Sequence, residues 1–262
     1  MDYNVLILKK NDCYKTFKRM KPCGIIVHST GVNNPNLKRY IGPDDGRLGK
    51  NIYDNHWNRP NISTCVHAFI GKDKDGTVCT YQTLPLYICA WGVGSGSKGS
   101  YNYDPAYLQF EILEDGLTSK KYFNKVMKEA QELCAKWCME YDLPVGKVIS
   151  HKEAHKKGYG SNHGDCDHWL KKFGKDMKWF RDEVSKILIN MKNQVQVGDK
   201  VKIRDGVDTY YDGKKLPSWV KKATLYARKK QVKDGVDVWL VSTNKTLPIY
   251  TGRLKTQDVV KA

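Results

Sequence analysis

The chain has 262 residues, of which 40% are hydrophobic and 28% are charged. This length suffices for one large domain or two ordinary ones, and the apolar content, with seven tryptophans and 16 tyrosines, indicates a globular protein and excludes a disordered one. Lysine and arginine outnumber the acidic residues by 45 to 28, so the net charge of +17 favours an acidic partner, either nucleic acid or an anionic surface. Because the lysines are spread along the chain, a polyanionic surface fits at least as well as nucleic acid.

The N-terminal segment MDYNVLILKKND has a short apolar run but neither a basic start nor a small-residue cleavage site. It therefore predicts a first strand and no signal peptide. No run approaches the roughly 20 apolar residues that span a bilayer, so we expect no transmembrane segment. The eight cysteines form no CxxC pair, which excludes a zinc ribbon and favours buried free thiols. We expect a chain that folds in the cytoplasm, or leaves it by a route that needs no secretion signal.

Up to about residue 190, strand-like runs alternate with helical patterns. The strand-like runs are 23–30 (CGIIVHST), the two halves of 65–84 around the turn KDKDG, 106–113 (AYLQFEIL) and 146–150 (GKVIS). Residues 91–102 form a glycine–serine loop, and apolar residues recur at helical spacing over 119–141, before Pro144, and over 174–190. The pattern predicts an α/β domain over residues 1–190, with a mixed β-sheet flanked by helices.

The sequence pattern changes in residues 191–262. Short runs, KVKI, TLYARK, VDVWLVS and LPIYTG, lie between Gly, Pro and Asp turns, which predicts a small all-β barrel. This segment has 16 basic and 7 acidic residues, or +9, and so carries more than half of the net charge. The density of charge indicates an anchoring module for an acidic partner.

Four of the seven histidines crowd into residues 150–169, SHKEAHKKGYGSNHGDCDHW. Metal binding, acid–base catalysis and an idle polar loop are the candidate explanations. His151 and His155 have the spacing of a zincin helix, but Glu153 would lie on the opposite helix face, so the zincin hypothesis fails.

A catalytic zinc site needs three protein ligands and an open position. His28 closes the 23–30 strand and His151 follows the 146–150 strand, so both rings can meet at the rim of one sheet. The third ligand must then come from SNHGDCDHW. A structural role for these histidines is the alternative.

Four separated motifs now point to a family. IIVHST, VHAFIGKDKDGTVCTYQTLP…AWGVG, QFEILEDG and SHKEAHKKGYGSNHGDCDHW, in this order and spacing, resemble the zinc-dependent N-acetylmuramoyl-L-alanine amidases of the amidase-2 type, which share a fold with peptidoglycan recognition proteins. The resemblance covers about residues 20–185. It implies hydrolysis of the amide between N-acetylmuramic acid and L-alanine in peptidoglycan; a non-catalytic peptidoglycan-binding protein on the same fold is the alternative.

The resemblance also implies roles for single residues. His28, His151 and Asp165 match the ligands of one catalytic Zn²⁺ ion, and Asp165 is favoured over Cys166, which stands where proline is usual. Glu111 falls on the catalytic glutamate. His163 stands at the position of a catalytic lysine, where it would stabilise the oxyanion.

Three positions bear further on the cleft. Glu111 lies in an otherwise apolar strand, so the residues alone leave it either an outward surface charge or a buried acid with a raised pKa. His67 matches a histidine near the cleft of many relatives and is expected either to bind substrate or to fill the core. Gly92 replaces a usual histidine, so one substrate contact is missing or replaced.

The segment 191–262 resembles, more loosely, the SH3-like wall-binding modules appended to such amidases. We expect it to bind anionic wall polymers, with its aromatic side chains divided between stacking and core, and we expect no nucleic-acid partner. The missing signal favours an endolysin that waits in the host cytoplasm until release and then acts on the cell wall.

Overall fold

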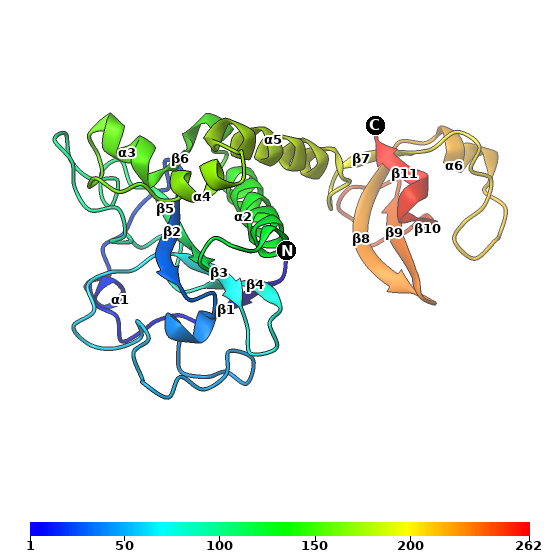
Figure 1. Cartoon of the computed structure of the whole chain (residues 1–262). Coiled ribbons are helices and arrows are strands. Elements are labelled where there is room, and N and C mark those ends of the chain that lie inside the picture. Colours follow the sequence, from blue (N-terminus) through cyan, green and yellow to red (C-terminus); the bar gives the residue numbers. More distant parts are fainter. The chain divides into compact units, whose positions relative to one another are not determined.

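The computed structural model describes residues 1–262, which form two compact units, Met1–Leu188 and Ile189–Ala262 (Figure 1). Each unit has its own sheet and its own apolar core. None of the helices is both long enough and apolar enough to span a bilayer.

The first unit is built on a six-stranded sheet in the order β1-β4-β3-β5-β2-β6. The strands are β1 (Tyr3–Val5), β2 (Ile25–Asn33), β3 (Ala68–Lys72), β4 (Val78–Gln82), β5 (Leu108–Glu114) and β6 (Val148–Ser150). The β3–β4 pair is the antiparallel hairpin that the turn KDKDG predicts, and the other neighbours run parallel. The predicted mixed sheet is therefore confirmed.

The register of three parallel strands brings polar residues side by side. His28 of β2 pairs with Glu111 of β5, and Val27 pairs with Ser150, the last residue of β6. His151 follows Ser150 directly and so lies beside His28. This row lies where β6 ends, and ligands of parallel sheets bind near the carboxyl ends of strands.

Both faces of this sheet are covered, which explains the unbroken apolar run of the predicted strand at 23–30. Ile25, Ile26 and Val27 are all fully buried, although alternate side chains of a strand face opposite sides. The accompanying helices and 3₁₀ turns are α1 (Asp12–Thr16), η1 (Leu37–Arg39), α2 (Lys120–Glu140), η2 (Val145–Lys147), α3 (His151–Lys157), α4 (Asp167–Lys172) and α5 (Met177–Asn193).

Helix α2 matches the helix predicted over 119–141. The Ser119 hydroxyl accepts the Tyr122 N–H and caps its first turn, and the helix ends before Pro144. Its apolar stripe packs against β3 and β4 and buries Phe123 and Trp137 almost completely.

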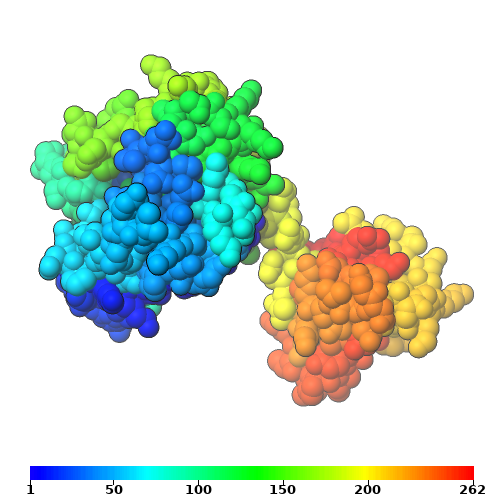
Figure 2. All heavy atoms as spheres, turned by 60° about the horizontal axis from the view of Figure 1, so that its bottom comes forward, coloured from blue at the N-terminus to red at the C-terminus, as the bar shows by residue number.

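The second unit contains a five-stranded antiparallel sheet in the order β10-β9-β8-β7-β11. Its elements are β7 (Lys200–Ile203), α6 (Ser218–Lys222), β8 (Leu225–Lys233), β9 (Val236–Ser242), β10 (Gly252–Lys255), η3 (Thr256–Asp258) and β11 (Val259–Lys261). Figure 2 shows its atoms, yellow to red, packed as a body of their own. The core includes Val201, Leu225 and Trp239.

One predicted strand of this unit is wrong. The run LPIYTG is mostly a loop that leaves Leu247, Ile249 and Tyr250 at least half exposed, and β10 begins only at Gly252. Pro248 cannot donate a ladder hydrogen bond. The loop is instead braced by Arg228, whose guanidinium donates to three backbone carbonyls, those of Asn244, Thr246 and Leu247.

Candidate metal centre and active site

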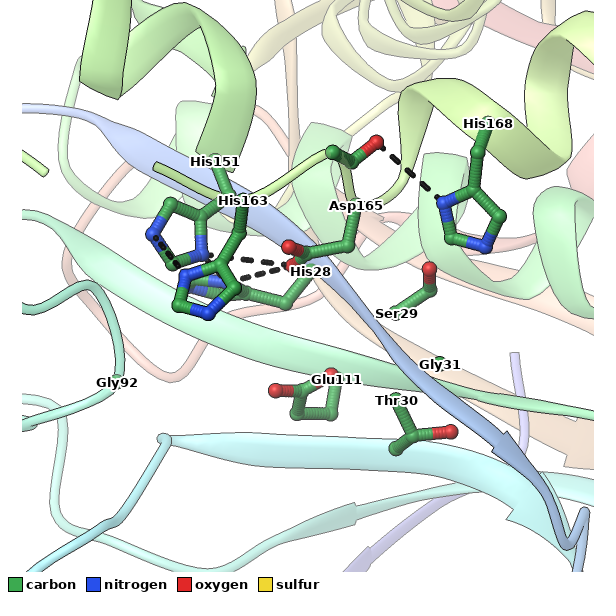
Figure 3. A pocket seen from close by; sticks show the side chains of 11 residues that line it. His28, Ser29, Thr30, Gly31, Gly92, Glu111, His151, His163, Asp165 and His168 are labelled. Atoms are coloured by element: carbon green, nitrogen blue, oxygen red, sulfur yellow. Dashed lines mark hydrogen bonds and ion pairs between the residues drawn. The ribbon is translucent and has the colours of Figure 1, made fainter. Parts of the chain in front are cut away.

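A cleft of about 490 Å³ opens beside β2 and β5 and the start of α3. Its lining combines residues from four parts of the sequence: His28, Ser29, Thr30, Gly31, Gly92, Glu111, His151, His163, Gly164, Asp165 and His168 (Figure 3). The crowded stretch 150–169 and the tip of the predicted 23–30 strand thus meet in space.

Three side chains converge on one point in this cleft. His28 Nδ1 and His151 Nδ1 lie 3.0 Å apart, and Asp165 Oδ2 lies 3.2 Å from the first and 3.5 Å from the second. Both rings are buried and the carboxylate is half-buried. These are the three residues that the sequence predicts as metal ligands.

The three atoms fit a zinc ion. A tetrahedral ion with bonds of about 2.0–2.1 Å separates its ligand atoms by about 3.3 Å, which matches the spacing of this triangle. Two imidazole nitrogens and a carboxylate oxygen are also donors that zinc prefers. Without a cation, two ring nitrogens 3.0 Å apart have room for only one proton between them.

The electrostatics of Asp165 agree with a ligand role. Burial alone would raise the pKa of this carboxyl, but hydrogen bonds from His151 and His28, together with their charges, outweigh burial and hold the pKa far below its usual range. Asp165 is therefore an anion, and an anion is the form that binds a metal.

The position of His151 is fixed by the start of helix α3. Ser150 caps this helix: its hydroxyl accepts the Glu153 N–H at 3.2 Å, and the Glu153 carboxylate accepts the Ser150 N–H at 3.1 Å. Arg181 of α5 holds the same carboxylate at 2.9 Å and donates to the Val148 carbonyl. Glu153 is thus a structural residue, which agrees with the rejection of the zincin hypothesis.

Glu111 lies in the cleft beside His28, as the strand register requires. Its Oε2 atom is buried and has no hydrogen-bond partner. Burial, followed by repulsion from Asp165 and Glu114, raises the pKa of this carboxyl well above its usual value. Of the two alternatives left by the residues alone, the surface charge is excluded.

His163 is exposed in the cleft wall. Its Nδ1 lies 3.0 Å from Ser161 Oγ and 3.4 Å from His151 Nε2, while its Nε2 makes no hydrogen bond. The structure therefore brings His163 to the predicted ligands with one ring nitrogen free.

His168, the last histidine of the crowded stretch 150–169, also lines the cleft. Its Nε2 lies 2.9 Å from the buried Glu114 carboxylate, which also accepts the Ser29 hydroxyl at 2.6 Å. The sequence carries part of this signal, because Ser29 follows His28 directly and Glu114 ends the strand that carries Glu111.

Two sequence candidates lie outside the cleft. His67 is fully buried: its Nε2 lies 2.9 Å from the Ile88 carbonyl and its Nδ1 accepts the Gln109 N–H at 3.0 Å. Burial lowers the pKa of His67 to about 4, so it is a neutral core residue with no access to substrate. Cys166 is likewise buried, with its sulfur against Met177, and burial raises the pKa of its thiol.

Comparisons with known proteins identify the family of this chain. The family model described as N-acetylmuramoyl-L-alanine amidase matches residues 18–166, more than half of the chain. No curated protein sequence matches the chain.

Among solved structures, the PlyG catalytic domain has a TM-score of 0.51 at 20% identity and covers 72% of this chain and 96% of its own. The Staphylococcus aureus hydrolase AmiA, solved in complex with its ligand, has a TM-score of 0.49 at 20% identity and covers 73% of this chain and 84% of its own. Because the family match includes His28, Glu111, His151 and Asp165, the chain belongs to the N-acetylmuramoyl-L-alanine amidase family and is a peptidoglycan hydrolase that cleaves the amide between N-acetylmuramic acid and L-alanine.

Proposed function

We propose that His28, His151 and Asp165 hold one catalytic Zn²⁺ ion. The observation that carries this proposal is the triangle of two Nδ1 atoms and one carboxylate oxygen, 3.0–3.5 Å on each side. A zinc ion bound there supplies a water of lowered pKa and a Lewis acid that polarises the scissile carbonyl.

Glu111 is the general base of this mechanism. It takes a proton from the attacking water and passes that proton to the nitrogen of the departing amine. Its place beside His28, its unpartnered Oε2 and its raised pKa support this role. A general base must lie within reach of the reacting water and have a pKa high enough to accept its proton.

His163 stabilises the oxyanion that develops on the carbonyl oxygen. Protonated, the ring has donors on both nitrogens, so Nδ1 can donate to Ser161 while the free Nε2 donates to the substrate. A lysine performs the same task with its ammonium group, which accounts for the exchange of residue type at this position.

The unit from Ile189 to the C-terminus acts as an SH3-like wall-binding module. Its net charge of +9 over residues 191–262 suits anionic wall polymers. Among its aromatic residues, Trp239 belongs to the core, whereas Trp219 is 57% exposed and is free to stack on a sugar or peptide. The intact protein then works as an endolysin that waits in the host cytoplasm and reaches the wall after release.

The metal site is tested by measuring zinc per chain after dialysis. The wild-type protein should hold one ion, and His28→Ala, His151→Ala and Asp165→Asn should each hold much less. His155→Ala is the matched control, because His155 is an exposed histidine of α3 that does not line the cleft and whose Nδ1 lies 3.1 Å from the Gly160 carbonyl. Equal zinc in all variants would contradict the site.

Deleting residues 191–262 tests the second unit. We expect pull-down by purified wall to fall sharply, and binding of the intact chain to weaken as salt rises. Unchanged binding after deletion would contradict the role of this unit.

A further inference from the structure

We infer that the backbone of residues 90–94 fixes which ring nitrogen carries the proton in both metal-binding imidazoles. Gln109 and Ser161 are the positioning residues that connect this backbone to the two rings by hydrogen bonds. The inference rests on the proposed metal site. Each histidine offers Nδ1 to that site, so a neutral ring must carry its proton on Nε2. The groups that face the two Nε2 atoms therefore decide whether the site is ready for a cation.

Gln109 faces His28. Its side chain is fully buried in β5, and its Nε2 donates to the Ala90 carbonyl at 3.4 Å and to Asn102 Oδ1 at 2.9 Å. Because a backbone carbonyl only accepts, the amide nitrogen must face Ala90 and the amide oxygen must face His28. Gln109 Oε1 lies 3.2 Å from His28 Nε2, so the ring donates there and its Nδ1 lone pair faces the metal centre.

Asn102 fixes the orientation of Gln109 a second time. Its Oδ1 accepts the Val93 N–H at 3.2 Å, and its Nδ2 donates to the Gly94 carbonyl at 3.4 Å. The same oxygen must then accept from Gln109. Two independent backbone contacts therefore impose one arrangement of hydrogen-bond donors.

Ser161 accepts a hydrogen bond from His151 Nε2, as Gln109 does from His28 Nε2. Its hydroxyl donates to the Val93 carbonyl at 3.2 Å, and its own N–H donates to that carbonyl at 2.9 Å. The protonated His163 ring proposed above donates to this hydroxyl oxygen from Nδ1, 3.0 Å away, so the Ser161 proton stays directed at the Val93 carbonyl. The hydroxyl oxygen then accepts from His151 Nε2, which lies 3.2 Å away. In the neutral ring, the Nδ1 lone pair of His151 then also faces the metal centre.

Two glycines leave the space for these side chains. A Cβ at Gly92 would lie 2.7 Å from Gln109 Oε1, and a Cβ at Gly94 would lie 2.7 Å from Ser161 Oγ. Gly94 also has a φ of +65°, which favours glycine. The motif AWGVG is thus shaped around the two positioning residues, which gives a physical reason for glycine at position 92.

The test is the affinity of the full-length protein for Zn²⁺ alone, measured by competition with a chromophoric chelator. Gln109→Met keeps the volume but removes the amide, and Ser161→Ala removes the hydroxyl. Each should weaken zinc binding about 10–100-fold. Ser161→Thr should restore the affinity. Gln131→Met is the control, because Gln131 is a buried glutamine of α2 outside the cleft.

Ring ¹⁵N shifts of the zinc-free protein, recorded with both rings neutral, provide a readout that a merely structural role would not move. The wild type should show His28 and His151 protonated at Nε2, and each variant should lose that signature at its own histidine only. Wild-type affinity and unchanged tautomers in both variants would overturn the inference. A wild type with these tautomers but without zinc affinity would instead contradict the proposed metal site, so the two failures are distinguishable.

Discussion

Replacing Glu111 by glutamine keeps the shape of the side chain and removes its capacity to accept a proton. A positioned general base contributes about 10²–10⁴ in rate, which at about 1.36 kcal/mol per tenfold is roughly 2.7–5.4 kcal/mol of transition-state stabilisation. Glu111 makes no hydrogen bond to His28, His151 or Asp165 in the structure, so zinc content should not change. We therefore expect turnover on purified wall to fall about 10²–10⁴-fold at full metal occupancy.

The same variant has a stability signature in the zinc-free protein. The pKa of Glu111 is raised in the folded state by burial and by repulsion from Asp165 and Glu114, so the folded state binds this proton more tightly than the unfolded chain does. The Glu111 proton therefore stabilises the folded state at pH values below the ordinary carboxyl pKa. This stabilisation is lost as the pH rises through the raised pKa of Glu111 in the folded state. At neutral pH, Glu111→Gln should therefore raise the melting temperature, by roughly 2–4 °C for each ~1 kcal/mol of penalty removed.

Both readouts can refute the reasoning. Wall lysis at the wild-type rate by Glu111→Gln would show that another group is the base. If Glu111→Gln melts at a lower temperature than the wild type at neutral pH, the buried carboxylate is not destabilising. The same conclusion follows if the increase in melting temperature is equally large in acid.

The remaining predictions concern three other parts of the molecule. His163→Ala should slow turnover about 10²–10³-fold with zinc retained, whereas His163→Lys should keep most of the activity; equal rates for both in a wall-lysis assay would contradict the oxyanion role. Arg181→Met should lower stability by about 1 kcal/mol, because its ion pair with Glu153 is only partly buried, and should weaken zinc binding through the start of α3; calorimetry and metal titration measure the two effects. Trp219→Ala should weaken wall pull-down about tenfold without changing the melting temperature, and unchanged pull-down would exclude stacking by Trp219.

Much of the amidase unit is predictable because its signals are local. The hairpin has its turn KDKDG, helix α2 has its cap at Ser119, and the two ligand histidines follow apolar strand runs. Their meeting in space follows from parallel pairing of neighbouring strands, which the sequence suggests but does not state. The sequence favours Asp165 over Cys166, and the structure places Asp165 in the cleft and Cys166 in the core.

Other features could not be predicted because they depend on packing. His67 has the same sequence context as a cleft residue, yet both of its ring nitrogens are bonded in the core. The run LPIYTG has the composition of a strand, but Arg228 binds its neighbouring carbonyls and it stays a loop. Gln109 lies on the same strand face as Glu111, two residues away, so alternation places it near the site; only the three-dimensional contacts show what it orients.

The central activity proposed for this protein is metal-assisted cleavage of a single bond in peptidoglycan. The most direct measurement is mass analysis of the products released from purified peptidoglycan by the full-length protein, as isolated, with a chelator, and after zinc is restored. We expect free L-alanine amino termini and intact glycan strands, loss of both products with the chelator, and their return with zinc. Undiminished release by the metal-depleted protein, or a cut at any other bond, would contradict the account.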